Sequence, residues 1–215
     1  MSHARAAAFE LVPALRRIED ELAIYEDLLR RWQSKINLVA PNTIDAVWVR
    51  HFADSGQVLE AAPEARVWAD VGSGAGFPGL VTALLLKDRP GAKVHLIESD
   101  QRKAAFLRAV SRETRAPAEV HAERIEKALP SLVGEVEAIS ARALAPLARL
   151  VDMAREPLDK GAIAVFLKGE EWLDELTAAE PLSSFRFKTI PSRTHPRARL
   201  IVVNSPSEAD FDRTD

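Results

Sequence analysis

The fold of this chain is decided by Val67-Trp68-Ala69-Asp70-Val71-Gly72-Ser73-Gly74-Ala75-Gly76-Phe77-Pro78-Gly79. The stretch begins as an apolar strand that ends in an acid, and it continues as a turn containing four glycines. Glycine is used where the backbone adopts positive φ or lies close to a ligand. Open α/β sheets bind nucleotides at the carboxyl ends of their strands. We therefore expect a nucleoside-containing cofactor at this turn.

A second strand that ends in an acid strengthens this interpretation. Lys93-Val94-His95-Leu96-Ile97-Glu98 follows the glycine-rich turn. An acid placed roughly 20 residues after such a turn binds the ribose of the cofactor. We expect Glu98 to accept hydrogen bonds from both ribose hydroxyls.

The turn fits two cofactor templates. Gly74-x-Gly76-x-x-Gly79 matches the dinucleotide fingerprint, whose helix N-terminus binds a pyrophosphate. Asp70-x-Gly72-x-Gly74-x-Gly76 matches the first motif of S-adenosylmethionine methyltransferases. We favour the second because a carboxylate repels a pyrophosphate at close range but suits the cationic amino-acid end of S-adenosylmethionine. An NAD(P)-dependent oxidoreductase and a noncatalytic nucleotide-binding module are the alternatives.

Composition limits the class of protein. The 215 residues are 47% hydrophobic, which is enough for one domain, or for one domain with an appendage. Cysteine is absent, so the sequence excludes disulfides, thiolate metal sites and a cysteine nucleophile. The sequence contains no apolar run of membrane-spanning length and no signal-peptide core at its start. We expect a cytoplasmic monomer with no membrane partner.

The apolar pattern divides the chain into three parts. Residues 1–63 are predicted to form an N-terminal helical cap, with one helix from Leu11 to Trp32 and a second capped by Thr43. Residues 64–204 predict a Rossmann-like methyltransferase domain, and the acidic residues 205–215 predict a disordered tail. The expected strands are 66–70, 93–98, 118–121, 136–140, 161–168, 184–190 and 199–204, with helices at 78–87, 100–115, 123–129, 143–156 and 170–178. This order predicts a seven-stranded, mostly parallel α/β sheet whose last strand is antiparallel.

Further motifs lie on both sides of the turn. They are Val49-Arg50-His51-Phe52-Ala53-Asp54-Ser55, Lys103-x-x-Phe106-Leu107, Ser140-Ala141-Arg142, Phe166-Leu167-Lys168-Gly169 and Arg199-Leu200-Ile201-Val202-Val203. In this order, and with the turn, they resemble the RsmG (GidB) family of bacterial 16S ribosomal RNA guanine-N7 methyltransferases. The resemblance covers roughly Leu22 to Asn204. It implies a class I methyltransferase fold, S-adenosylmethionine as cofactor, and 16S rRNA or the small ribosomal subunit as partner.

The resemblance also assigns site residues. By motif position it places Gly72, Phe77, Ile125, Glu126 and Arg142 against the cofactor and Glu98 at the ribose. Asp70, Gly74 and Gly76 of the turn complete the predicted cofactor-binding set. Arg142 follows a strand's carboxyl end, so we expect it to position the cofactor or the guanine. We expect His51 to line the entrance of the substrate site. We do not expect it to act as a base, because a His-x-x-Asp pair on a helix more often caps the helix or orients neighbouring side chains.

Clustered cations predict the surface that contacts RNA. The net charge is −3, so the protein as a whole is no polycation, and local clusters decide phosphate binding. The residues expected to face phosphate are Arg50, Lys168, Arg193, Arg197 and Arg199. A small-molecule methyltransferase, a further alternative, would not need this basic segment. We expect no metal, because neither His121 nor His195 lies within a run of carboxylates.

Overall fold

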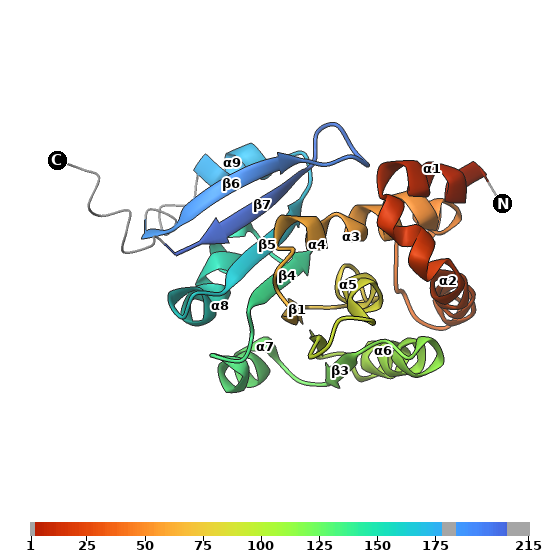
Figure 1. The fold of residues 1–215 in the computed structure, drawn as a ribbon, viewed down its shortest axis with the longest axis horizontal. Helices are drawn as coiled ribbons and strands as arrows, with labels where there is room; N and C mark the ends of the chain where they lie inside the picture. The colour runs from red at the N-terminus through yellow and green to blue at the C-terminus, as the bar shows by residue number, and fades with distance from the viewer. Residues whose placement is uncertain (1–2, 178–183, 206–215) are drawn as a thin grey trace.

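In the computed structural model, which describes residues 3–177 and 184–205, seven strands form one mixed sheet in the order β3-β2-β1-β4-β5-β7-β6 (Figure 1). The strands are β1 (Val67–Val71), β2 (Lys93–Ile97), β3 (Ala118–His121), β4 (Ala138–Arg142), β5 (Ile163–Lys168), β6 (Arg186–Pro191) and β7 (Arg199–Asn204). β7 pairs antiparallel with both β5 and β6. The predicted fold is confirmed, and the antiparallel strand lies inside the sheet and not at its edge.

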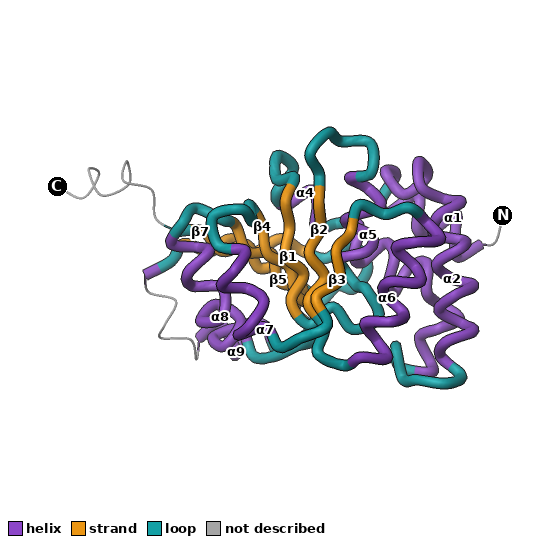
Figure 2. The backbone as a smooth tube through the Cα atoms, turned by 90° about the horizontal axis from the view of Figure 1, so that it is seen from below, coloured by secondary structure: helices purple, strands orange, loops and turns teal. Residues whose placement is uncertain are grey.

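Helices cover both faces of this sheet (Figure 2). On one face, α5 (Gly79–Leu86) and α6 (Gln101–Thr114) share an apolar core with the helices of the N-terminal segment. On the other face lie α7 (Ile125–Ala128), the 3₁₀ helix η4 (Leu129–Leu132), α8 (Leu147–Asp159) and α9 (Trp172–Thr177). The central parallel strands β1, β4 and β5 are buried on both faces and are mostly apolar, whereas the edge strand β3 is only partly buried.

Asp100 caps α6 as its sequence position predicts. Its carboxylate accepts hydrogen bonds from the backbone N–H groups of Arg102 and Lys103, at 2.8 and 3.2 Å. These are two of the donors that the first turn of a helix leaves without a partner. The cap therefore fixes the start of α6 three residues after Glu98.

The N-terminal segment is more broken than the sequence predicted. It contains α1 (His3–Leu11), the 3₁₀ helix η1 (Pro13–Ile18) and α2 (Glu19–Gln33), where one helix was expected from Leu11. Pro13 lacks an N–H group, so it starts a new helix instead of continuing α1. The alanine-rich first residues form α1, which the apolar spacing alone did not reveal.

The prediction that Thr43 caps the next helix is wrong. The 3₁₀ helix η2 (Pro41–Ala46) starts after Ala40, and Thr43 lies within it, where its hydroxyl donates to the Ala40 carbonyl at 2.7 Å. A π-helical segment, η3 (Trp48–Ala53), follows and leads into α3 (Asp54–Gly56) and α4 (Val58–Ala61). π-helical turns are rare and occur often at functional sites. This one carries His51.

Aromatic packing joins the N-terminal segment to the glycine-rich turn. Tyr25 of α2 is fully buried and stacks on Phe77, with ring centroids 5.2 Å apart. It also contacts Phe52 of η3 and Phe106 of α6, and its hydroxyl donates to the Ala75 carbonyl within the turn. The predicted cap at residues 1–63 therefore shares one core with the sheet layer. The boundary at residue 63 stays a prediction.

Two further sequence expectations concern membranes and the tail. Within the described residues, no helix combines the length and the apolar character needed to cross a membrane. Of the predicted disordered tail, residues 206–215 lie outside the described residues. The last residue of the predicted helix at 170–178 also lies outside them.

We expect Gly79→Ala to destabilise the fold. A methyl group at Gly79 would lie 2.5 Å from Leu96 Cδ2 and 2.6 Å from Asp70 Cβ. Overpacking of this kind lowers the free energy of unfolding by about 1–3 kcal/mol. Gly169→Ala is the matched control, because no atom lies within 4 Å of its added methyl group. Denaturant unfolding of both variants measures the difference, and equal stabilities would contradict the predicted clash.

Candidate active site

The glycine-rich turn adopts a backbone shape that other residues avoid. Gly72, Gly74 and Gly76 have φ values of 67°, 56° and 90°. The N–H of Ser73 donates to the Ile97 carbonyl at 3.0 Å, and the N–H of Gly74 donates to Glu98 Oε2 at 2.9 Å. Hydrogen bonds therefore hold the turn against the end of β2. Every second residue from 72 to 76 has a positive φ angle, which explains why glycine occupies these three positions.

A cavity of about 470 Å³ opens over this turn. Most of the predicted cofactor-binding residues line it: Gly72, Gly74, Phe77, Glu98, Ile125, Glu126 and Arg142. A methyl group built on Gly74 would meet only the Gly72 carbonyl oxygen within 4 Å, at 3.8 Å, so the backbone there is open to a ligand. The structure thus brings together residues that are up to 70 positions apart in the chain.

Gly76 and Asp70 are the two predicted cofactor residues that do not line this cavity. A methyl group at Gly76 would collide with Leu80 and the Tyr25 hydroxyl, so Gly76 allows close packing beneath the turn. Asp70 is 1% exposed, and its Oδ1 accepts a hydrogen bond from Ser140 Oγ at 2.7 Å. Burial raises the pKa of Asp70 to about 6, and the bond from Ser140 partly offsets that rise.

Glu98 uses both carboxylate oxygens to hold backbone. Oε2 accepts from Gly74 N–H, and Oε1 accepts from Asp100 N–H at 2.7 Å. A carboxylate oxygen has more than one acceptor site, so each can also accept a hydroxyl from the cavity side. Glu98 therefore joins the turn to the start of α6 and still presents acceptors to the cavity.

A second cavity, of about 790 Å³, adjoins the first. Its lining includes Arg50, His51 and Asp54 from the N-terminal segment and Lys168, Thr194 and Arg199 from the far side of the sheet. Leu38, Val39, Arg142 and Ala143 line both cavities. Arg142 is the charged residue among these four. A molecule bound in one cavity and a molecule bound in the other would therefore both lie next to its side chain.

The guanidinium of Arg142 is held on several sides. Its Nη2 lies 2.9 Å from His51 Nδ1, and its Nη1 lies 3.3 Å from both Asp54 Oδ2 and the Arg50 carbonyl oxygen. The guanidinium carbon lies 4.9 Å from the centre of the Phe77 ring. Arg142 and Asp54 side chains are only 18% and 19% exposed, so the ion pair is largely removed from water.

His51 is neutral in this environment. Burial, together with the nearby charges of Arg142 and Arg50, lowers the pKa of His51 to about 3. Its Nδ1 faces Arg142, its Nε2 lies 2.9 Å from Thr43 Oγ1, and its ring stacks on Phe77 at 4.8 Å. An imidazole with this pKa is a poor proton acceptor near neutral pH, so His51 orients Arg142.

Several residues of this network were not among the predicted site residues. Asp54 pairs with Arg142, and its Oδ1 accepts from Thr194 Oγ1 at 2.6 Å. The three-residue spacing of His51 and Asp54 on a helix was the available signal, because it puts both on one face. Thr194 lies 140 positions away, on the β6–β7 hairpin, and carries no such signal.

The predicted RNA-facing cations have different environments. Arg193 pairs with Glu60 and donates to the Leu11 carbonyl, and Arg197 pairs with Glu170 at 2.6 Å. Lys168 is 9% exposed and contacts Glu175 and the Ala145 carbonyl. Arg199 donates to two carbonyls of its own hairpin and lies over Trp172. Arg50 is exposed at the larger cavity.

The fold is similar to that of solved methyltransferases. The structure is similar to a SAM-dependent O-methyltransferase from Thermotoga maritima, with a TM-score of 0.56 and 14% identity over 86% of this chain and 72% of that one. It is also similar to M. jannaschii TYW2 in complex with AdoMet, with a TM-score of 0.54 and 12% identity over 80% and 78%. The chain has the class I methyltransferase fold.

Sequence comparison then gives the family. Residues 18–198 match the GidB family, described as rRNA small subunit methyltransferase G. Two relatives carry the name ribosomal RNA small subunit methyltransferase G. The one from Rhodospirillum centenum is 52% identical over 86% of this chain and 83% of its own length. The one from Bradyrhizobium sp. (strain ORS 278) is 46% identical over 93% and 90%. This chain belongs to that family, and the resemblance seen in the sequence is confirmed.

We expect Asp70→Asn to change how stability depends on pH. The pKa of Asp70 is about 6 in the folded protein against an ordinary value of 3.8, so folding takes up a proton between these values. The free energy of unfolding must then fall as pH rises through this window, by about 3 kcal/mol in total. The Asn variant lacks this contribution, so its stability relative to wild type rises from pH 4 to pH 6 and is constant above that. Denaturant unfolding at several pH values measures this, and a constant difference would contradict it.

Proposed function

We propose that this protein transfers a methyl group from S-adenosylmethionine to N7 of one guanine in 16S rRNA. The observation that carries the proposal is the pair of cavities that share Arg142 as a wall residue. The smaller cavity has the open glycine backbone and the acceptors of Glu98, which suit a nucleoside cofactor. The larger one has room for a nucleotide, and Arg50, Lys168 and Arg199 are among the residues that line it.

The residues present fit S-adenosylmethionine. Glu98 would hold the ribose hydroxyls, and Ile125 and Glu126 of α7 would lie along the nucleoside. Gly72, Gly74 and Phe77 would form the floor, and Arg142 would lie where the two cavities meet. Asp70 acts from below, by fixing Ser140 and the base of the turn. When bound, S-adenosylmethionine supplies a methyl group activated by a sulfonium charge.

The proposed chemistry needs positioning and no strong base. N7 of guanine has an in-plane lone pair, so it can attack carbon without first losing a proton. The new bond joins N7 to the methyl carbon, the carbon–sulfur bond breaks, and its electron pair goes to sulfur. This chain's residues have to align the two partners and exclude water, which is catalysis by proximity and orientation. The low pKa of His51 agrees with such a mechanism.

The rim of the larger cavity supports an RNA substrate over a small molecule. Arg50 is an exposed cation that lines this cavity, Arg199 also lines it, and the exposed Arg197 pairs with the lining residue Glu170. A guanine must leave its stack to enter such a site, and single-stranded loops supply bases in that state. We propose that the protein acts as a cytoplasmic monomer. In this proposal these residues contact the phosphates of the RNA, whether the RNA is naked or part of the small ribosomal subunit.

Ligand-dependent melting of wild type and Glu98→Ala tests the cofactor. S-adenosylhomocysteine should raise the melting temperature of wild type, and NAD(H) should leave it unchanged. Charge-assisted hydrogen bonds contribute about 1.5–3 kcal/mol, so Glu98→Ala should bind S-adenosylhomocysteine at least about tenfold more weakly. Asp88→Ala is the control, because Asp88 does not line the cavity. Stabilisation by NAD(H) alone would overturn the cofactor, and unchanged affinity in Glu98→Ala would move the ribose contact elsewhere.

Mapping the methyl group on 16S rRNA tests the reaction, with Arg142→Ala and His51→Gln as variants. We expect one new 7-methylguanine, a loss of turnover of about 100-fold or more in Arg142→Ala, and a loss under about 10-fold in His51→Gln. A general base contributes on the order of 10²–10⁴-fold. A loss of that size in His51→Gln, together with a rate that titrates near neutral pH in wild type, would contradict the base-free mechanism. A methyl group on an exocyclic amine or a ribose would overturn the target atom.

The salt dependence of RNA binding tests the proposed contacts of Arg50 and Arg197 with RNA phosphates. Replacing Arg50 and Arg197 together by Gln should weaken binding and flatten the slope of log affinity against log salt. Each lost phosphate contact on a single strand reduces that slope by about 0.7. The control pair is Arg108→Gln with Arg112→Gln on α6, because neither residue lines either cavity. Equal slopes in the two double variants would remove Arg50 and Arg197 from the RNA surface.

A further inference from the structure

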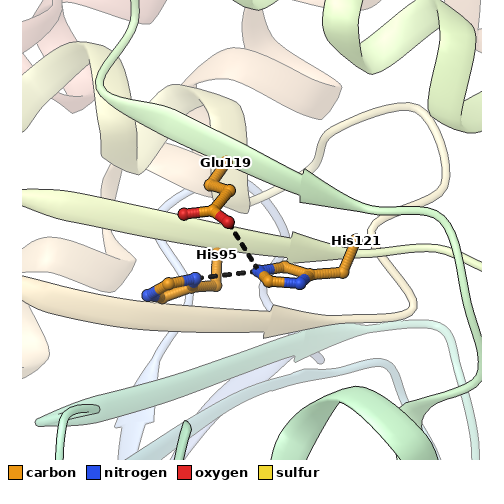
Figure 3. Close-up of side chains that lie close together, drawn as sticks. All are labelled: His95, Glu119 and His121. Carbon is orange, nitrogen blue, oxygen red and sulfur yellow. Dashed lines mark hydrogen bonds and ion pairs between the residues drawn. The ribbon is translucent and has the colours of Figure 1, made fainter. Parts of the chain in front are cut away.

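Three metal-ligating side chains meet at the β2–β3 edge of the sheet. Parallel pairing sets His95 opposite Glu119 and Ile97 opposite His121. Because side chains alternate along a strand, residues 95, 119 and 121 point to the same face. One ligand atom from each lies within 4.8 Å of the other two. Figure 3 shows the three side chains together. The sequence separates these residues, which is why no metal cluster was expected from it.

The distances are close to those of a coordination shell. His95 Nδ1 lies 2.9 Å from His121 Nε2, and Glu119 Oε1 lies 4.0 Å from the same His121 atom. Ligand atoms around a tetrahedral zinc with bonds of about 2.1 Å lie roughly 3.3 Å apart. The two rings therefore need to separate only slightly. The Glu119 side chain is 53% exposed and can turn inward without disturbing the core.

A second carboxylate, that of Glu135, lies beside the buried histidine. His95 is 1% exposed, and its Nε2 lies 3.4 Å from Glu135 Oε1. Within the part of the chain that the structure describes, this buried nitrogen has no hydrogen-bond partner of good geometry. Histidines that bind metals commonly donate their other N–H to a carboxylate, which fixes the tautomer. An N–H from Nε2 towards Glu135 leaves the lone pair of Nδ1 facing His121.

The charges around the cluster are compatible with a cation. Glu119 Oε2 pairs with Lys93 Nζ at 2.7 Å, and Glu135 Oε1 lies 3.6 Å from the same nitrogen. The lysine neutralises one of the two carboxylates and leaves a net charge of −1 before a metal binds. Lys93 uses Glu119 Oε2, so Oε1 is the oxygen that faces the histidines. Burial lowers the pKa of His95, which keeps its ring in the neutral form that binds metals.

We propose that His95, Glu119 and His121 bind a divalent transition metal of the zinc type, with Glu135 as the positioning carboxylate. Two imidazoles and one carboxylate are a donor set that zinc favours, and hard cations such as Mg²⁺ prefer oxygen ligands alone. The site lies beside the proposed cofactor cavity without lining it. The His121 carbonyl accepts from the N–H of Glu98 at 3.0 Å, so the metal joins β3 to β2 next to Glu98.

Zinc titration of the full-length chain, with no affinity tag and after chelator treatment, tests this site. A chromogenic chelator as competitor gives the affinity and the stoichiometry. We expect one zinc per wild-type chain. Glu135→Gln should keep that stoichiometry and bind about 10–100-fold more weakly, the range for outer-shell partners. His121→Gln and Glu119→Gln each lose a ligand and should weaken binding more than Glu135→Gln does.

The matched control is His3→Gln, which removes an exposed histidine far along the chain from the cluster and should bind zinc like wild type. Thermal unfolding adds a second readout: zinc should raise the melting temperature of wild type and His3→Gln but not of His121→Gln. Unfolding in chelator and binding of S-adenosylhomocysteine check that each variant is folded. Zinc affinity in His121→Gln equal to that of wild type, or no binding by wild type at micromolar zinc, would overturn the proposal. The proposed methyl transfer would be unaffected by that result.

Discussion

The buried guanidinium of Arg142 is the constraint on which the arrangement of this molecule depends. A charge removed from water is tolerated only when it is paired and hydrogen-bonded. Arg142 leaves the end of β4, and its partners Asp54, His51 and the Arg50 carbonyl all come from one short stretch of the N-terminal segment. That stretch must therefore pack against the carboxyl edge of the sheet. The two cavities exist on either side of the resulting junction.

The glycine-rich turn depends on support from both sides. Glu98 binds Gly74 from the neighbouring strand, and Tyr25 binds the Ala75 carbonyl from the N-terminal segment. Phe77 is stacked by Tyr25 on one side, and His51 and Arg142 also lie against it. Rigid support of this kind holds a backbone site in the shape that its ligand needs, which reduces the ordering that binding requires. The helical cap is therefore part of the proposed cofactor site.

The electrostatics of the junction favour alignment over proton transfer. Burial and neighbouring cations lower the pKa of His51, so its ring is neutral near pH 7, while Asp70, whose pKa burial raises to about 6, lies beneath the turn and lines neither cavity. The main fixed charge between the cavities is then Arg142 with Asp54. A reaction in which a lone pair attacks carbon needs geometry more than it needs a base. The arrangement agrees for that reason with the proposed methyl transfer to N7 of guanine.

The sequence by itself determined the class of fold and the glycine-rich turn beneath the proposed cofactor cavity. These features are local patterns in the sequence: apolar strands that alternate with helices, glycines at 72, 74 and 76, and an acid at Glu98. A turn with positive φ angles requires the glycines, and a ribose site at the end of the next strand requires the acid. The tertiary structure alone decided three other matters: the depth of Asp70, the pairing of Asp54 with Arg142 and with Thr194, and the meeting of His95 with His121. Each depends on strand register or on contacts between segments up to 140 positions apart. Such contacts leave no periodic trace in the sequence, because they are fixed by the packing of the whole core and not by neighbouring residues.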